Sequence, residues 1–267
     1  MSNTFEINSV KSDNINMEYL KFGSGEKNLV IIPGLSIKSV LLSAEGVVSA
    51  YNAFADDYTV YLFDRNKIIC EHYTVDDMAE ETAFAIKTIG IKNADFFGVS
   101  QGGMIAECIA IKYPELVHKM VLGSTMARVN ETAKCAIEEW IHLAQERNLT
   151  ALVDNFAEKL FSKEFCNKFG EFIRTSNDDT DDIGLDRFVA LAKATDGFDV
   201  FNSLDKIKCP VLILGAENDK VVSGKASKEM AKRIQDSEIY MYGENYGHGV
   251  YDEAPDYKDR ILEFLRK

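Results

Sequence analysis

Ser100 and the glycines around it form the stretch with the clearest chemical potential, Gly98-Val99-Ser100-Gln101-Gly102-Gly103. An apolar run ends at this serine and a helix-like segment begins directly after it, so the pattern G-x-S-x-G falls on a strand-to-helix turn. Such a turn strains the serine backbone, and it needs small residues two positions before and after the serine because strand and helix crowd it. In this context Ser100 is predicted to be a nucleophile.

A serine nucleophile needs a base, because a free hydroxyl attacks poorly at neutral pH. Of the four histidines, His118 and His142 fit structural or surface positions, and His72 stands in a loop that could line the mouth of a site. His248 follows the last predicted strand and stands between two glycines, in a loop that can bring an imidazole over Ser100. His248 is therefore the predicted base.

The imidazole of such a base needs a carboxylate that fixes its tautomer and stabilises its charged form. Asp219 comes shortly after the apolar run 211–215, in a loop at the same edge of the predicted sheet as Ser100. Glu217 stands close by and is the alternative, although an ordinary solvated carboxylate needs no catalytic role. We expect Asp219 to be the acid.

Acyl transfer also needs preorganised donors for the oxyanion of its tetrahedral intermediate, each worth roughly 3 kcal/mol. The backbone N–H of Gln101, at the start of the helix after Ser100, is the first expected donor. The backbone N–H of Leu35, after Pro33-Gly34, is the second expected donor. The same residues would also occur in an ordinary turn that uses glycine for its positive φ. Because a triad and two backbone donors suffice for this chemistry, neither a metal nor an organic cofactor is implied.

Alternating strand and helix signals describe the scaffold that must position these groups. Apolar runs predict strands at 28–32, 58–63, 119–123 and 209–215, in addition to the strand that leads into Ser100 and a strand at 238–242. Two antiparallel edge strands are predicted at 5–8 and 15–22, and helices at 74–90, 101–113, 224–235 and 254–266. This alternation predicts an α/β fold with a doubly wound, mostly parallel sheet.

The segment 126–203 differs from the rest of the chain, because it is helix-forming and charged and contains no proline. It predicts an all-helical cap, inserted into a core formed by 1–125 and 204–267. Five phenylalanines recur in it at helical spacing and are expected to form mostly the core of the cap, with some of them able to line an apolar pocket. They are Phe156, Phe161, Phe165, Phe169 and Phe172.

Charge and cysteine content exclude several classes of partner and site. The chain has 30 Lys and Arg against 43 Asp and Glu, a formal net charge of −13, which argues against nucleic acid and anionic membrane surfaces as partners. The five cysteines show no CxxC or CxxH spacing, so neither a disulfide framework nor a zinc site is predicted. No signal peptide and no apolar run of about 18 residues is visible, and a reducing cytoplasm is the simplest compartment.

Taken together, these motifs resemble the α/β-hydrolase fold superfamily, and within it the compact, helical-capped esterases, haloperoxidases and lyase-like enzymes. The resemblance covers essentially the full length and is patchier in the cap. It implies Ser100 as nucleophile, Asp219 as acid and His248 as base, in the order that the family uses. The motifs that carry it are Ile32-Pro33-Gly34-Leu35, Leu62-Phe63-Asp64-Arg65, Gly98–Gly103, Tyr113-Pro114-Glu115, Pro210–Gly215 with Glu217-Asn218-Asp219, and Gly247-His248-Gly249.

Two departures from the family pattern concern the entrance to the site. Pro33-Gly34 stands where the family usually has His-Gly, which affects how the loop of the oxyanion hole is anchored. After Asp64-Arg65 the family commonly continues with a glycine-rich loop, whereas here the loop 66–75 begins with Asn66-Lys67-Ile68-Ile69-Cys70. We therefore expect a reshaped mouth.

The sequence thus favours a carboxylesterase-like serine hydrolase that acts on a small, partly apolar ester or related acyl compound through an acyl-enzyme. A C–C lyase or a perhydrolase on the same triad is one alternative, and a small-molecule binding protein that kept the pocket is another. The three intact triad positions weigh against a mere binder, which has no physical need of all three. The substrate itself and a possible homo-oligomer cannot be read from the sequence.

Overall fold

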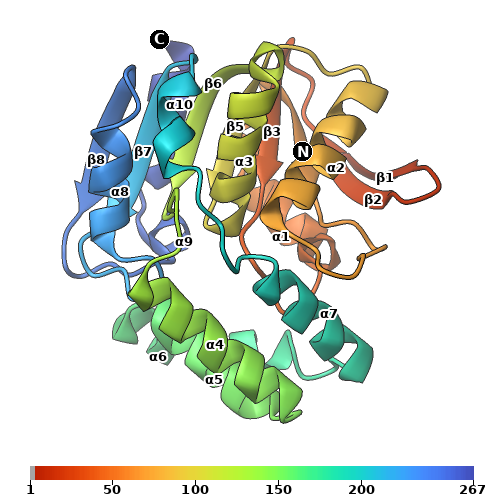
Figure 1. The fold of residues 1–267 in the computed structure, drawn as a ribbon, viewed down its shortest axis with the longest axis vertical. Helices are drawn as coiled ribbons and strands as arrows, with labels where there is room; N and C mark the ends of the chain where they lie inside the picture. Colours follow the sequence, from red (N-terminus) through yellow and green to blue (C-terminus); the bar gives the residue numbers. More distant parts are fainter. Residues whose placement is uncertain (1–3) are drawn as a thin grey trace.

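The computed structural model describes residues 4–267, and an eight-stranded sheet forms its centre (Figure 1). The strand order is β1-β2-β4-β3-β5-β6-β7-β8, in which β1 pairs with β2 and β2 with β4 antiparallel and all other pairs are parallel. This confirms the predicted doubly wound, mostly parallel sheet. The strands are β1 Phe5–Lys11, β2 Asn16–Phe22, β3 Lys27–Ile32, β4 Tyr58–Phe63, β5 Ala94–Val99, β6 Val117–Gly123, β7 Val211–Ala216 and β8 Ser237–Tyr242.

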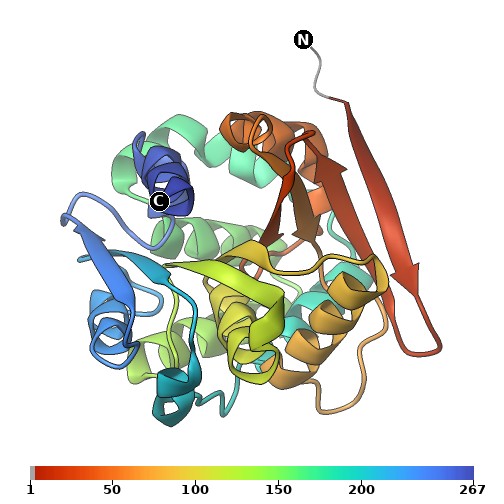
Figure 2. The ribbon, with the colours of Figure 1, turned by 90° about the horizontal axis from the view of Figure 1, so that it is seen from above.

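Helices cover both faces of the sheet, as the view from above in Figure 2 shows. Alternate residues of the central strand β3 belong to two separate apolar cores: Val30 and Ile32 to one, and Leu29 and Ile31 to the other. The first core includes residues of α2, α3 and α8, and the second those of α1 and α10. These helices are α1 Ala44–Ala50, α2 Val75–Thr88, α3 Gln101–Lys112, α8 Gly224–Ala231, α9 Val250–Glu253 and α10 Tyr257–Arg266.

The ends of these helices follow local sequence signals. Thr74 caps α2 with a full capping box, in which its hydroxyl accepts from the N–H of Asp77 and its own N–H donates to the Asp77 carboxylate. The predicted helix 254–266 is present as α10, but it begins only at Tyr257, after Pro255, and the short α9 that precedes it was not predicted. Among residues 4–267, no helix is both long and apolar enough to cross a membrane.

Four helices lie between β6 and β7, within the segment predicted as the cap, and in Figure 1 they pack together beyond one end of the sheet. They are α4 Glu131–Gln145, α5 Leu149–Leu160, α6 Lys163–Thr175 and α7 Asp182–Lys193. Each helix has an N-cap residue whose side chain accepts a hydrogen bond from a backbone N–H of the first turn. In chain order these residues are Asn130, Asn148, Ser162 and Asp181. These caps explain how a stretch without proline divides into separate helices.

Glu107 on α3 is an unusual member of the core, because it is fully buried and neither of its carboxyl oxygens has a hydrogen-bond partner among residues 4–267. Burial raises its pKa well above the ordinary value of 4.5. The folded protein therefore keeps a proton on Glu107 that the unfolded chain releases. For this reason the contribution of Glu107 to the free energy of unfolding falls as the pH rises above its ordinary pKa.

Replacing Glu107 by Gln should remove that dependence while keeping the shape of a neutral acid. Between pH 5 and 8 we expect the free energy of unfolding of the wild type to fall relative to Glu107→Gln by up to about 1.4 kcal/mol per pH unit, until the folded-state pKa is passed. Urea unfolding of both proteins at several pH values measures this difference. Parallel curves for the two proteins would show that Glu107 does not hold a proton in the folded state.

Candidate active site

Ser100 lies between β5 and α3 with φ of 53° and ψ of −123°, a strained backbone for a residue other than glycine. Neighbouring residues hold this turn in place. The N–H of Ser100 donates to the carbonyl of Gly123 at 2.9 Å, and its carbonyl accepts from the hydroxyl of Thr125 at 2.6 Å. The strain predicted from the motif is present, and the side chain is partly exposed.

Two glycines around Ser100 are required by contacts between backbones. A Cβ atom on Gly98 would lie 2.6 Å from the carbonyl oxygen of Gly102. A Cβ atom on Gly102 would lie 2.0 Å from the carbonyl oxygen of Ile32. Both distances are too short for any side chain, so the strand β5, the helix α3 and the end of β3 can meet at the serine only through glycine.

Asp219 and His248 form a buried pair, each less than a tenth exposed. The carboxylate oxygen Oδ2 of Asp219 lies 2.8 Å from Nδ1 of His248, and its Oδ1 accepts from the N–H groups of Val221 and Val222 at 2.8 Å each. Burial alone would raise the pKa of Asp219, but His248 and the three hydrogen bonds outweigh it and leave that pKa below its ordinary value. An ionised Asp219 favours the tautomer with a proton on Nδ1 and a free Nε2.

Asp219 follows β7 and His248 follows β8, which lie two and three strands away from β5 in the sheet. The strands from β5 to β8 all run in the same direction. Among the hydrogen bonds of residues 4–267, none joins the ring of His248 to Ser100, so their direct approach remains a prediction. Catalytic hydrogen bonds of this kind often tighten only when substrate is bound.

The alternative residues weighed from sequence lie elsewhere. Glu217 pairs with Lys228 at 2.7 Å on the surface instead of approaching His248. His72 is 92% exposed, and His142 is exposed on α4. His118 pairs with Asp95 at 2.7 Å, near the start of β5 and thus at the opposite end of that strand from Ser100.

Both expected oxyanion donors belong to segments that adjoin Ser100. Gln101 follows it directly at the first position of α3, and Gly34, which precedes Leu35, is close enough that its Cβ would lie 3.7 Å from the serine Oγ. The backbone N–H groups of Leu35 and Gln101 are both absent from the hydrogen bonds of residues 4–267. Both are therefore available as donors, although their role stays a prediction.

A cavity of about 360 Å³ opens beside this turn, between the loop after β3 and the helices α5 and α6. Gly34, Leu35 and Val99 line it, so it reaches the immediate neighbours of Ser100, which itself is not part of the lining. The four-helix segment adds six apolar residues to the wall: Val153, Phe156, Ala157, Leu160, Phe161 and Ile173.

The four-helix segment is attached to the loops that carry the site. The carbonyl of Leu160 accepts from the N–H of Gly249, next to His248, at 2.7 Å, and the N–H of Ser162 donates to Glu253 at 3.0 Å. On the other side of the cavity Lys38, in the loop after β3, pairs with Asp179. No group of three or more His, Cys, Asp or Glu side chains in residues 4–267 is placed to hold a metal ion.

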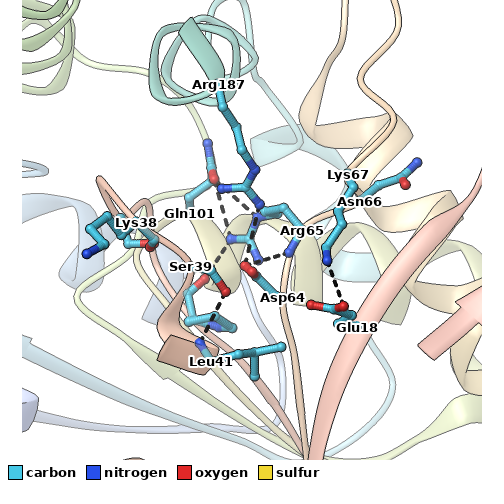
Figure 3. A network of polar contacts seen from close by, with 12 residues as sticks. Glu18, Lys38, Ser39, Leu41, Asp64, Arg65, Asn66, Lys67, Gln101 and Arg187 are labelled. Atoms are coloured by element: carbon cyan, nitrogen blue, oxygen red, sulfur yellow. Dashed lines mark hydrogen bonds and ion pairs between the residues drawn. The ribbon is translucent and has the colours of Figure 1, made fainter. Parts of the chain in front are cut away.

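Arg65 is a feature of the site whose importance the sequence did not reveal. It follows β4 within the motif Leu62-Phe63-Asp64-Arg65, and it is 5% exposed. Figure 3 shows its guanidinium between Asp64 and Gln101, with Arg187 beyond it. The only signal in the sequence was the Asp-Arg dipeptide at the end of a strand, which does not show what the arginine contacts.

The class of protein is established by a family model for the alpha/beta hydrolase fold, which matches residues 28–255. The chain belongs to this family. It is 21% identical over 264 residues to 3-oxoadipate enol-lactonase 2 of Acinetobacter baylyi, covering 97% of this chain and 96% of that protein. A 2-hydroxy-6-oxononadienedioate/2-hydroxy-6-oxononatrienedioate hydrolase of Paraburkholderia phymatum is 24% identical, with 94% and 91% covered.

Solved structures show the same fold. MGS-M2, an alpha/beta hydrolase enzyme from a Medee basin deep-sea metagenome library, superposes with a TM-score of 0.87 at 22% identity, covering 97% of this chain and 98% of that one. At this level of identity the structural similarity shows the fold alone. The chemistry has to be inferred from the residues of the site.

Proposed function

We propose that the protein is a serine hydrolase that cleaves a small, partly apolar carboxylic ester or related acyl compound through an acyl-enzyme. The observation that carries this proposal is the strained turn of Ser100 together with the buried, hydrogen-bonded pair of Asp219 and His248. The names of two relatives, an enol-lactonase and a hydrolase, support the same broad class.

In the first half of the reaction, Nε2 of His248 takes the hydroxyl proton as Ser100 Oγ attacks the carbonyl carbon. The N–H groups of Leu35 and Gln101 donate to the oxygen that becomes negatively charged. Asp219 keeps the other ring nitrogen protonated and stabilises the imidazolium. When the tetrahedral intermediate collapses, His248 returns the proton to the leaving alcohol, and the acyl group stays on the serine.

In the second half, water takes the place of the alcohol. His248 removes a proton from the water as its oxygen attacks the acyl carbon, and the same two N–H groups stabilise the second oxyanion. Collapse breaks the bond to Ser100, which regains its proton from His248. The products are the carboxylic acid and a free enzyme.

The cavity supports a small and mainly apolar substrate. Its volume of about 360 Å³ is near the lower end of the range of ligand pockets, roughly 300–1,000 Å³. Only Lys38 and Asp252 bring full charges to its lining, and Lys38 is paired with Asp179. We therefore expect short or medium acyl groups to be preferred over long ones.

Hydrolysis of p-nitrophenyl esters of graded acyl length tests the proposed function. The wild type should hydrolyse short esters with a steep fall in kcat/KM for long chains, and Ser100→Ala should be inactive toward all of them. Full activity in Ser100→Ala would show that another residue attacks the ester. A wild type that leaves every ester intact would favour lyase chemistry or a binding role.

Enlarging the cavity should change which ester is preferred. Phe156 lines it from α5, so Phe156→Ala is expected to shift the optimum toward longer acyl groups, with little change in kcat for the shortest ester. The matched control is Phe172→Ala on α6, because Phe172 is 69% exposed and lies outside the lining. An unchanged preference in Phe156→Ala would place the acyl group elsewhere.

A further inference from the structure

Arg65 makes two contacts that converge on the turn of Ser100. Its Nη2 donates to the carbonyl of Pro33 at 2.6 Å. Its Nε and Nη2 both lie 3.4 Å from Oε1 of Gln101, at the long end of the hydrogen-bond range. The guanidinium thus contacts both Gln101, beside which it lies in Figure 3, and the turn 33–35, which carry the two expected oxyanion donors.

The turn 33–35 has few other means of being held. Pro33 has no backbone N–H and Gly34 has no side chain, so neither can anchor the turn in the usual ways. Among the hydrogen bonds made by side chains of residues 4–267, the one from Arg65 is the only one that reaches this turn. The carbonyl of Pro33 belongs to the peptide whose N–H is that of Gly34, so holding it fixes the plane of that peptide, from which Gly34 leads to the Leu35 N–H. Gly34 is itself packed against the nucleophile, because a Cβ atom on it would lie 3.2 Å from the Cβ of Ser100.

The side chain of Gln101 is held from its other end. Its Nε2 donates to the carbonyl of Leu191 on α7 at 2.7 Å and to the hydroxyl of Thr195 at 3.2 Å. With Oε1 facing Arg65 and Nε2 facing α7, the amide has one orientation only. Gln101 therefore connects the guanidinium to the four-helix segment directly beside the nucleophile.

Asp64 supplies a negative charge beside the guanidinium. The carboxylate of Asp64 accepts from the backbone N–H of Arg65 at 2.8 Å, and Arg187 of α7 lies 3.7 Å from the same carboxylate. Burial lowers the pKa of Arg65 to about 10, against the opposing effect of Asp64, so the side chain remains charged at neutral pH. The hydrogen bonds of this buried charge go to Pro33 and Gln101, the two places at which a preorganised site needs support.

We propose that Arg65 is a positioning residue for the oxyanion hole, holding the Leu35 N–H in register with the Gln101 N–H. The inference rests on the proposed serine hydrolase activity. Arg65 does not touch the reacting atoms; it acts through the Pro33 carbonyl and the Gln101 side chain. The flat, forked guanidinium reaches both at once, which the single ammonium of a lysine cannot do.

The test uses Arg65→Met and Arg65→Lys with a short p-nitrophenyl ester and with a trifluoromethyl ketone, which forms an oxyanion when the serine adds to it. For Arg65→Met we expect kcat to fall about 100-fold, the cost of a misplacement on the order of 1 Å, with KM within about twofold of the wild type. Affinity for the ketone should fall by the same factor as kcat. Arg65→Lys should lose about tenfold, since it keeps the charge without the fork.

Arg187→Met is the matched control, because Arg187 faces the same Asp64 but has no hydrogen bond to the turn 33–35 among residues 4–267. Its kcat should stay within about twofold of the wild type. Circular dichroism establishes that each variant is folded, and if Arg65→Met is not, Arg65→Lys decides.

Three results would overturn the inference. One is a pair of folded Arg65 variants with wild-type kcat and ketone affinity. Another is a rise in KM at constant kcat, which would make Arg65 a substrate-binding residue. The third is a wild type inert toward ester and ketone alike, which contradicts the proposed function first and this inference with it.

Discussion

Replacing His248 by Ala should lower kcat for ester hydrolysis by about a millionfold, because Ser100 would lose its proposed base and the other three histidines, His72, His118 and His142, lie elsewhere. The residual rate over water would come from the oxyanion hole and substrate binding alone. The measurement is kcat with a short p-nitrophenyl ester at neutral pH, with KM determined separately.

His118→Ala is the matched control for this variant. His118 also pairs with a buried carboxylate, that of Asp95, but near the start of β5, away from Ser100. It should keep wild-type activity at neutral pH. An equal loss in both variants would point to general destabilisation, and a loss of less than about a hundredfold in His248→Ala would exclude His248 as the base.

Replacing Asp219 by Asn should lower kcat by about four orders of magnitude while leaving the fold intact. Oδ2 of Asp219 lies 2.8 Å from Nδ1 of His248, so the present carboxylate holds the proton on Nδ1. An amide can turn its NH₂ group toward Nδ1, which then has to accept, and the proton moves to Nε2 where it blocks attack by Ser100.

Glu217→Gln is the control for this second variant, because Glu217 stands two positions before Asp219 and pairs with Lys228. Its kcat should match that of the wild type. If Glu217→Gln lost as much activity as Asp219→Asn, the acid would have been assigned to the wrong carboxylate.

The parts of the site that could be predicted from sequence are those with local signals. Ser100 stands in a motif whose glycines are required by backbone contacts within the turn itself, as Gly98 and Gly102 show. Asp219 and His248 follow β7 and β8, neighbouring parallel strands, and the ends of such strands meet at one edge of the sheet. Their pairing at 2.8 Å agrees with that reading.

Other parts depend on packing between distant segments. The short helix α1 was not predicted, because Gly46 lies in its middle and its stability comes from Ala44 and Val48 in the second apolar core. The contacts of Arg65 could not be foreseen for the same reason: they join residues 32 and 36 positions apart in sequence. The shape of the cavity likewise follows from how α5 and α6 pack over the loop after β3.

Labelling with a fluorophosphonate probe tests most directly whether Ser100 is an activated nucleophile. The probe's tetrahedral adduct resembles the transition state of acyl transfer, so an activated serine captures it. We expect an adduct on Ser100 at neutral pH, located by mass spectrometry, and no adduct in Ser100→Ala. An unlabelled Ser100 in folded wild-type protein at neutral pH would show that the serine is not activated.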